Sequence, residues 1–220
     1  PSRILQMDLP VAVFNVDATT RHRSLNTQDA LLAHLAAGPL AAPVAVYTEV
    51  SSKFFAARLA AGRDACYADH AFGRADRTVQ LFPPEYDTDA PTSVSDRGKY
   101  LYTPLSVDGQ TVLLYTVHLS RRDAAARKRQ LGLLVRSVEK HRGDAHEVVV
   151  CGDFNTPCDA LLERFAGMGL GAAVRPGDAP TAASGSIDNL LATAPITGVA
   201  RWADSKFTHV PFAASLRAEK

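Results

Sequence analysis

Residues 148–155 read VVVCGDFN, an apolar run that ends abruptly in a polar turn. A short run rich in β-branched residues is typical of a buried strand, and we therefore expect a strand over residues 147–151. Asp153 and Asn155 follow this strand directly. Because an unpaired carboxylate is costly inside a sheet, we expect both side chains at the end of the strand, in a position to serve a site.

Polar residues stand at or beside the ends of several other apolar runs. They are Asn15, Asp17, Glu49, His118, Asp188 and His209. The simplest explanation is that these side chains converge on a cation and a substrate. The set suits Mg²⁺, with Mn²⁺ as an alternative, because Mg²⁺ prefers a few carboxylate oxygens and retained waters. Zinc would require more His or Cys ligands, whereas one histidine beside a carboxylate suits acid–base chemistry on a water.

The periodicity of apolar residues predicts the other elements. The pair Asp108-Gly109 between two apolar runs is a strong hairpin signal. Further strands are expected over residues 11–16, 44–50, 78–82, 100–107, 111–119, 187–192 and 212–216. Helices are expected over residues 26–35, from 51–52 onward, over 121–141 and over 160–168. The stretch from 66 to 94 is expected to form loops around the strand at 78–82.

Composition indicates a globular chain of 220 residues, 46% of them hydrophobic, and we expect residues 1–220 to form a single domain. A formal net charge of +1 produces little long-range attraction to the phosphates of nucleic acid, so any binding of nucleic acid must come from a local basic patch. The three cysteines show no CxxC spacing, which favours an intracellular, reducing compartment. No apolar run has the ~18 residues of a spanning helix. Since the chain begins with Pro1, we expect it to be processed or excerpted.

These residues together resemble the endonuclease/exonuclease/phosphatase (deoxyribonuclease-I-like) superfamily, and the resemblance runs from about Val11 to Leu216. Its most specific stretch is the sequence VHL at 117–119, followed by Arg127, Gln130 and the run VVVCGDFN. The resemblance implies an α/β fold, a four-layered α/β/β/α sandwich of two mixed, mainly antiparallel sheets. It also implies a phosphoesterase in which Mg²⁺ assists the attack of water.

The resemblance assigns a metal site to four residues. Glu49 stands where the family has its principal Mg²⁺-binding glutamate, and Asn15 where an asparagine supports metal and phosphate. Asp17 matches an acidic residue of the abasic-endonuclease branch. Asp153 matches the aspartate that positions or activates the attacking water, and we expect it to contact the metal as well.

The resemblance also implies the groups that bind phosphate and move protons. Asn155 matches a phosphate ligand, and His118 resembles the phosphate-binding histidine of the deoxyribonuclease and phosphatase branches. Asp188 and His209 resemble an Asp–His pair in which the carboxylate orients the imidazole. Arg97 precedes the predicted hairpin, where it is expected to reach a phosphate.

One motif departs from the family pattern. The family reads Ser-Asp-His-x-Pro, and here residues 207–211 read FTHVP. Thr208 therefore replaces an aspartate that commonly helps to bind metal, while His209 is kept. We expect weaker metal binding than in the family.

The sequence favours a Mg²⁺-dependent phosphodiesterase, with nucleic acid as the leading substrate by analogy with the many nucleases of this class. A phosphatase or phosphodiesterase for a small phosphorylated molecule or a lipid headgroup is an alternative. A catalytically silent binding module is a further alternative, which Thr208 supports and the joint presence of the other site residues opposes. The basic cluster at 121–129 fits either a nucleic-acid contact or a solvated helix face, and basic clusters on helices are more often solvated faces.

Overall fold

Two six-stranded sheets dominate the computed structural model, which describes residues 7–16, 42–62, 65–73, 76–175, 178–182, 187–201 and 209–218. The first sheet has the strand order β11-β12-β1-β2-β4-β3. Its strands are β1 (Met7–Asn15), β2 (Val44–Val50), β3 (Cys66–Gly73), β4 (Asp76–Phe82), β11 (Ile196–Arg201) and β12 (Phe212–Ala218). The second sheet has the order β5-β6-β7-β8-β10-β9. Its strands are β5 (Ser93–Ser95), β6 (Tyr100–Val107), β7 (Gln110–His118), β8 (Glu147–Asp153), β9 (Gly171–Ala172) and β10 (Asp188–Ala192).

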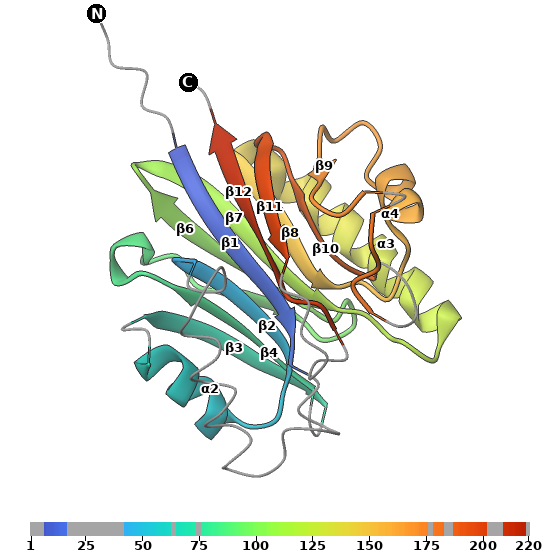
Figure 1. Ribbon diagram of the computed structural model, residues 1–220, viewed down its shortest axis with the longest axis horizontal. Helices are drawn as coiled ribbons and strands as arrows, with labels where there is room; N and C mark the ends of the chain where they lie inside the picture. The colour runs from blue at the N-terminus through green and yellow to red at the C-terminus, as the bar shows by residue number, and fades with distance from the viewer. Residues whose placement is uncertain are drawn as a thin grey trace, which may run out of the picture.

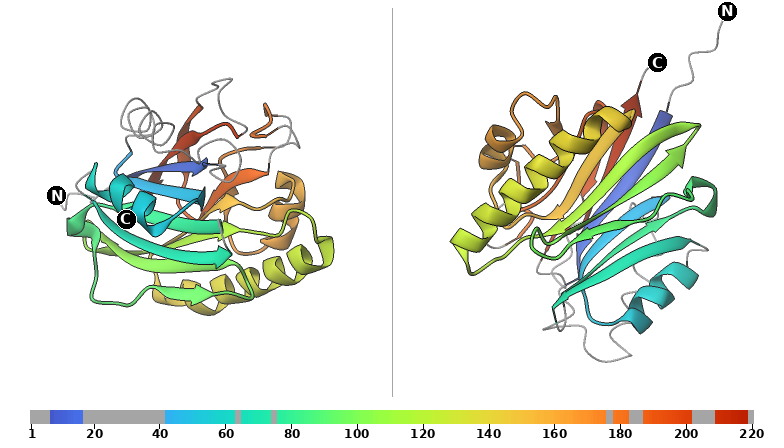
Figure 2. Two further views of the ribbon diagram at one scale, coloured as in Figure 1. Left: turned by 90° about the horizontal axis from the view of Figure 1, so that it is seen from below. Right: turned by 180° about the vertical axis from the view of Figure 1, so that it is seen from behind.

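The sheets pack face to face, and helices cover their outer faces (Figures 1 and 2). Helix α2 (Lys53–Ala61) lies on the first sheet, and α3 (Ala124–His141) and α4 (Cys158–Arg164) lie on the second. Two short 3₁₀ turns, η2 (Pro84–Tyr86) and η3 (Arg142–Asp144), complete the described helical elements. The described helices are each too short or too polar to cross a membrane.

Three separate apolar cores account for these four layers. The core between the sheets includes Val11, Val46 and Leu114, all buried. The other two cores lie between each sheet and its own helices, around Phe55 on α2 and Leu134 on α3. Strands buried on both faces are apolar throughout rather than alternating, as the run VVVC in β8 is. The expected four-layered sandwich is confirmed.

Local sequence signals explain where several elements begin and turn. Asp108 and Gly109 both adopt positive φ, of 49° and 74°, which is the geometry of a tight hairpin turn between β6 and β7. Helix α3 begins at Ala124 rather than 121, because the Asp123 carboxylate accepts a hydrogen bond from the amide of Ala126 and caps the helix. Helix α4 begins and ends earlier than expected, at Cys158 and Arg164.

The expectation of loops between 66 and 94 was wrong. Strand β3 pairs with β4 along most of its length, and β5 adds an edge strand to the second sheet. Strand β11, also unpredicted, pairs with β12. These edge strands carry half-buried and exposed residues instead of an apolar run. The helix expected over 26–35 lies outside the described residues and stays a prediction.

Candidate active site

The predicted site residues meet at one edge of the sandwich because of how the central strands run. Each sheet contains one parallel pair, β1–β2 and β7–β8, so the carboxyl ends of these strands lie at the same edge. His118 ends β7 directly beside Asp153 at the end of β8. Strand β10 is antiparallel to β8 and starts at this edge, which places Asp188 opposite Asp153.

Gly152 permits the close approach of the two strands that carry His118 and Asp153. Its φ is +124°, and a Cβ added there would lie 2.3 Å from the backbone oxygen of Val117. Any side chain would therefore push β7 and β8 apart, in addition to straining a backbone conformation that favours glycine. The fold therefore requires glycine at position 152, the first residue of the GDFN sequence.

Glu49 is carried on a distorted part of β2. Its φ is 55°, in the left-handed region, and the pairing of β2 with β4 shifts register between Tyr47 and Val50. A non-glycine residue in this region costs on the order of 1–3 kcal/mol, and such strain concentrates at functional sites. Here the irregularity accompanies the placement of the Glu49 carboxylate among the other site residues.

Asn15 links the two acidic side chains at the centre of the site. Its Nδ2 donates to Oδ2 of Asp153 at 2.9 Å and lies 3.2 Å from Oε1 of Glu49. Asn15 and Asp153 are buried. The amide therefore holds the carboxylates of two different sheets at a fixed separation.

His118 is oriented by an aspartate that the sequence did not single out. Its Nδ1 forms a short hydrogen bond with Oδ1 of Asp76, whose other oxygen forms an ion pair with Nζ of Lys99. The opposite ring atom, Nε2, lies 3.4 Å from Oε1 of Glu49 and 3.8 Å from Oδ2 of Asp153. The imidazole thus bridges Asp76 and the central carboxylates.

The charges around His118 favour its protonated form. Burial lowers the pKa of His118, but the hydrogen bond to Asp76 and the nearby carboxylates outweigh it and raise the pKa above its ordinary value. Burial likewise raises the pKa of Asp76, and the contacts with His118 and Lys99 more than offset this and lower it. Asp76 was missed because it begins β4, inside the stretch expected to form loops.

A second Asp–His pair stands on the other side of Asp153. Nδ1 of His209 lies 2.7 Å from Oδ2 of Asp188, and both side chains are buried. Burial lowers the pKa of His209, but the hydrogen bond and charge of Asp188 outweigh it and raise the pKa to about 9. The predicted pairing of these two residues is present in the structure.

Thr181, another residue that the sequence did not single out, fixes the backbone of this second pair. Its buried hydroxyl accepts hydrogen bonds from the amides of Ile187 and Asp188 at 3.1 and 3.0 Å. Its carbonyl accepts from the amide of Val210 at 2.6 Å, next to His209. No sequence pattern marks Thr181, because its role depends on backbone groups brought together only by the fold.

Asp153 lies between the two Asp–His pairs and is the most perturbed acid of the site. Burial and the negative charge of Asp188 raise its pKa to about 6, although His118 and His209 act in the opposite direction. A buried carboxylate with a raised pKa beside a second acid is typical of a functional site. At neutral pH Asp153 is mainly ionised and remains able to accept a proton.

The donor set fits a divalent cation of the Mg²⁺ or Mn²⁺ type. Ligand atoms of Glu49, His118 and Asp153 lie within 4.8 Å of one another, and so do those of Asp153, Asp188 and His209. Oδ1 of Asp188 is buried and has no hydrogen-bond partner among the described residues. A buried oxygen of this kind needs a ligand or a water to satisfy it, and carboxylate oxygens are what a hard cation prefers.

Asn155 follows Asp153 and is held by two hydrogen bonds. Its backbone nitrogen donates to Oδ1 of Asp153 at 2.8 Å, and its side-chain Nδ2 donates to the backbone carbonyl of Leu119 at 2.9 Å. Its φ of 47° is one that asparagine tolerates better than most residues. Asn155 therefore joins the loops that follow β7 and β8 and orients Asp153.

Arg97 is exposed to solvent, whereas Arg127 and Gln130 hold a loop of the protein in place. Arg97 is exposed in the turn that also carries Lys99, the partner of Asp76. Arg127 donates to the carbonyls of Ser120 and Arg121, so it fixes the loop after β7. Gln130 is buried and accepts a hydrogen bond from the amide of Ser120. Arg127 and Gln130, which both belong to the stretch that carries the resemblance, therefore both hold the loop after β7. Asp17 and Thr208 lie outside the described residues.

Comparison with known proteins agrees with this architecture. No protein-family model and no curated protein sequence matches this sequence. Solved structures are similar over almost the whole chain. A functionally unknown conserved protein from Enterococcus faecalis V583 aligns with a TM-score of 0.75 at 14% identity, covering 96% of this chain and 100% of its own.

Two further solved structures extend the comparison. TDP2 from D. rerio, complexed with a single-strand DNA product, aligns with a TM-score of 0.72 at 15% identity and covers 94% of this chain and 98% of its own. An endonuclease/exonuclease/phosphatase family protein from Bacteroides thetaiotaomicron aligns with a TM-score of 0.70 at 12% identity, covering 96% and 98%.

Proposed function

Because the chain has the fold of the endonuclease/exonuclease/phosphatase proteins, we propose that it is a divalent-metal-dependent phosphodiesterase that cleaves its substrate with water. The observation that carries the proposal is the convergence of two Asp–His pairs on one buried aspartate. Asp76–His118 and Asp188–His209 flank Asp153, which Asn15 ties to Glu49.

Glu49 and Asp153 are the residues that would hold the metal, with Asp188 as a further ligand. A divalent ion bound there would stabilise the charge that develops on the phosphoryl oxygens. In the sequence, Thr208 replaces an aspartate of the family pattern, and this loss of a carboxylate supports one principal ion and at most a weak second one. Asp17 is proposed as an outer acidic residue of the same site.

The protein's own groups account for the proton transfers. Asp153 takes a proton from the attacking water, whose oxygen forms the new bond to phosphorus. His209, protonated at neutral pH because of Asp188, gives a proton to the leaving oxygen as its ester bond breaks. Positioned acid–base groups of this kind contribute about 10²–10⁴-fold to the rate.

The remaining residues bind the phosphate or hold the loop beside it. His118, held by Asp76, offers a positive charge to the nonbridging oxygens. Asn155 holds the loop beside them, and Arg97 extends the positive charge outward from the same edge. Nucleic acid is the proposed substrate class. This is supported by the exposed Arg97, Arg121 and Arg122 and by the single-strand DNA product bound to TDP2 from D. rerio.

The test is a cleavage panel at a range of Mg²⁺ and Mn²⁺ concentrations. Single-stranded DNA, double-stranded DNA, RNA and bis(p-nitrophenyl) phosphate are each incubated with the wild type, Glu49→Gln and Glu139→Gln. Glu139 is exposed on α3 and supplies the same chemical change away from the site. We expect metal-dependent cleavage, fastest on a nucleic acid, by the wild type and Glu139→Gln but not by Glu49→Gln.

Two results would change the proposal. Cleavage of only the small phosphodiester would favour a small-molecule phosphodiesterase, for which the net charge of +1 is the supporting observation. A wild type that cleaves no substrate at any metal concentration would favour a binding module of this fold.

A further inference from the structure

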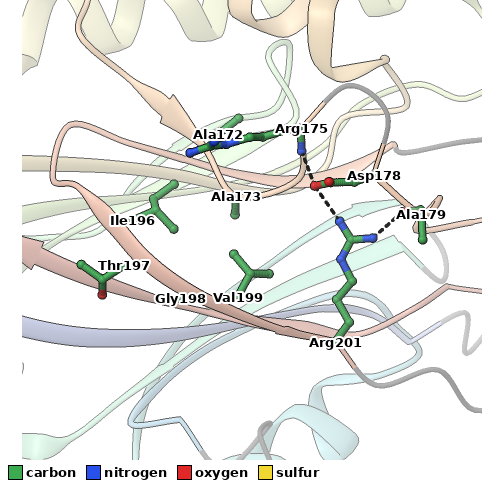
Figure 3. Close-up of a pocket in the computed structure, with 10 residues that line it drawn as sticks. All are labelled: Ala172, Ala173, Arg175, Asp178, Ala179, Ile196, Thr197, Gly198, Val199 and Arg201. Carbon is green, nitrogen blue, oxygen red and sulfur yellow. Dashed lines mark hydrogen bonds and ion pairs between the residues drawn. The ribbon is translucent and has the colours of Figure 1, made fainter.

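A cavity of about 360 Å³ opens between β9 and β11, at the edges of the two sheets (Figure 3). Its apolar wall includes Ala173, Ile196 and Val199, and its polar side is formed by Arg175, Asp178 and Arg201. Among the described residues, none of those assigned to the active site lines this cavity. Its polar side is nevertheless connected to the active site through the chain that follows Asp178.

Arg201 fastens the end of β11 to the segment 178–182. Its Nη2 lies 3.1 Å from Oδ2 of Asp178, and its Nη1 donates a short hydrogen bond to the carbonyl of Ala179 (Figure 3). The same Asp178 oxygen accepts from the backbone amide of Arg175 at 2.8 Å. We call this set of contacts among Arg201, Asp178 and Ala179 the Arg201 clasp.

The segment that the clasp holds also holds both members of the Asp188–His209 pair. Thr181, two residues after Ala179, accepts hydrogen bonds from the amides of Asp188 and Val210. Ala182 forms an isolated β-bridge with His209 itself. A displacement of this segment would therefore move the backbone on both sides of the 2.7 Å contact between the two catalytic side chains.

Apart from the clasp, the described contacts of the first half of this segment are with Arg175: the amide of Asp178 donates to the carbonyl of Arg175 at 3.1 Å, and the Asp178 carboxylate accepts from the amide of Arg175. Asp178, Ala179 and Pro180 are all exposed, and no apolar core includes them. Arg201, by contrast, belongs to a strand paired with β12, where it stands opposite Phe212. A guanidinium can bond a carboxylate and a carbonyl at once in a fixed geometry, so the clasp transfers the rigidity of the sheet to the segment.

We propose that Arg201 is a positioning residue for the Asp188–His209 pair, acting through Asp178, Ala179 and Thr181. The kinetic part of this inference rests on the proposed function, whereas the structural part does not. Loss of the clasp lets residues 178–182 leave their place more often, which breaks the hydrogen bonds that Thr181 accepts. The imidazole and its carboxylate then spend less time in the arrangement needed for proton transfer.

The structural part is tested by amide hydrogen exchange, followed residue by residue by NMR. The variants are Arg201→Ala, Arg201→Lys and the matched control Arg175→Ala, which removes a cation from the same cavity but leaves the clasp intact. In Arg201→Ala we expect the amides of Asp188 and Val210 to exchange about tenfold faster, as lost charged hydrogen bonds allow local opening. Arg201→Lys should recover part of the protection, and Arg175→Ala should match the wild type.

The kinetic part uses the best substrate of the cleavage panel. Arg201→Ala should lower kcat by about tenfold with little change in KM, because positioning acts on proton transfer rather than on substrate affinity. Arg201→Lys should restore most of kcat, and Arg175→Ala should leave it unchanged. A wild type without activity would contradict the proposed function, while the exchange rates would still decide on the clasp.

Three results would overturn the inference. Unchanged exchange at Asp188 and Val210 in Arg201→Ala would show that the clasp does not hold the segment. If amide exchange at Asp188 and Val210 became as fast in Arg175→Ala as in Arg201→Ala, the positive charge in the cavity would matter and the clasp would not. Faster exchange with an unchanged kcat would show that the segment does not position the catalytic pair.

Discussion

Nδ1 of His209 lies 2.7 Å from Oδ2 of Asp188, and the two side chains are only 10% and 2% exposed. The carboxylate uses one oxygen for the imidazole and leaves the other, Oδ1, without a partner among the described residues. The proposed chemistry depends on this arrangement, since it keeps His209 protonated and aimed at the acidic cluster.

Replacing His209 should therefore affect turnover far more than binding. We expect His209→Ala to lower kcat by about 10²–10⁴-fold with a small change in KM, the size typical of a lost acid–base group. His146→Ala is the matched control, because His146 is exposed at the opposite end of β8. Steady-state kinetics on the best substrate would refute the role of His209 if both variants retained wild-type turnover.

The pH dependence of activity should report the same pair. Asp188 raises the pKa of His209 to about 9 against the effect of burial, so we expect kcat to decline as pH increases through about 9. In Asp188→Asn the hydrogen bond to a charged acceptor is lost, and the decline should move to lower pH. Asp159→Asn, on the exposed start of α4, should leave the profile unchanged, and an unchanged profile in Asp188→Asn would contradict the assignment.

The stability contribution of this pair has a definite sign. Because the pKa of His209 is higher in the folded protein than its ordinary value of 6.5, the pair stabilises the fold fully below about pH 6.5. This contribution is lost as pH increases through about 9.

Asp153 should destabilise the metal-free protein. Burial and Asp188 raise its pKa from 3.8 to about 6, so the folded state binds the proton more tightly than the unfolded state. The cost of ionising Asp153 thus grows between about pH 4 and pH 6 and is complete above that. Since a tenfold change in proton affinity corresponds to about 1.4 kcal/mol, we expect Asp153→Asn to stabilise the protein at pH 8 by about 1–3 kcal/mol.

Urea denaturation in the presence of EDTA measures this effect. The two proteins should approach equal stability as the pH falls well below 3.8, the unfolded value, where Asp153 is protonated in both the folded and unfolded states. A variant less stable than the wild type at pH 8 would show that the buried charge is compensated without a metal.

Asp76 should matter for activity beyond its contribution to stability. Asp76→Asn weakens the contacts with both His118 and Lys99, and we expect it to destabilise the fold by about 1–3 kcal/mol. Asp69→Asn is the matched control, because Asp69 forms a similarly half-buried ion pair with Arg77 in the same β3–β4 hairpin. Both variants should lose stability in thermal denaturation, but only Asp76→Asn should lower kcat, by about tenfold or more. If Asp76→Asn and Asp69→Asn had the same kcat, Asp76 would have only a structural role.

Much of the site could be predicted because strand ends carry a clear signal. A polar residue after an apolar run stands out in the sequence, and Asn15, Glu49 and Asp153 were all recognisable in this way. Parallel pairing then brings such ends together. The resemblance to a known family supplied the four layers, which the hydrophobic pattern of single strands does not specify.

The features that could not be predicted depend on partners far apart in the chain. Asp76 begins an edge hairpin whose strand β3 alternates half-buried and exposed residues, so it gives no apolar run to mark it. Thr181 and Arg201 act on backbone groups of other segments, and such contacts leave no local pattern. The roles of Asp17 and Thr208, the single domain and the intracellular compartment stay predictions.

The central claim is that Glu49 and Asp153 hold a divalent cation, and titration calorimetry with Mg²⁺ and Mn²⁺ tests it most directly. The wild type and the exposed-glutamate control Glu139→Gln should each bind one ion with the same affinity, and Glu49→Gln should bind at least about tenfold more weakly, equivalent to about 1.4 kcal/mol. Absence of divalent binding by the wild type, or unchanged affinity in Glu49→Gln, would contradict this account of the site.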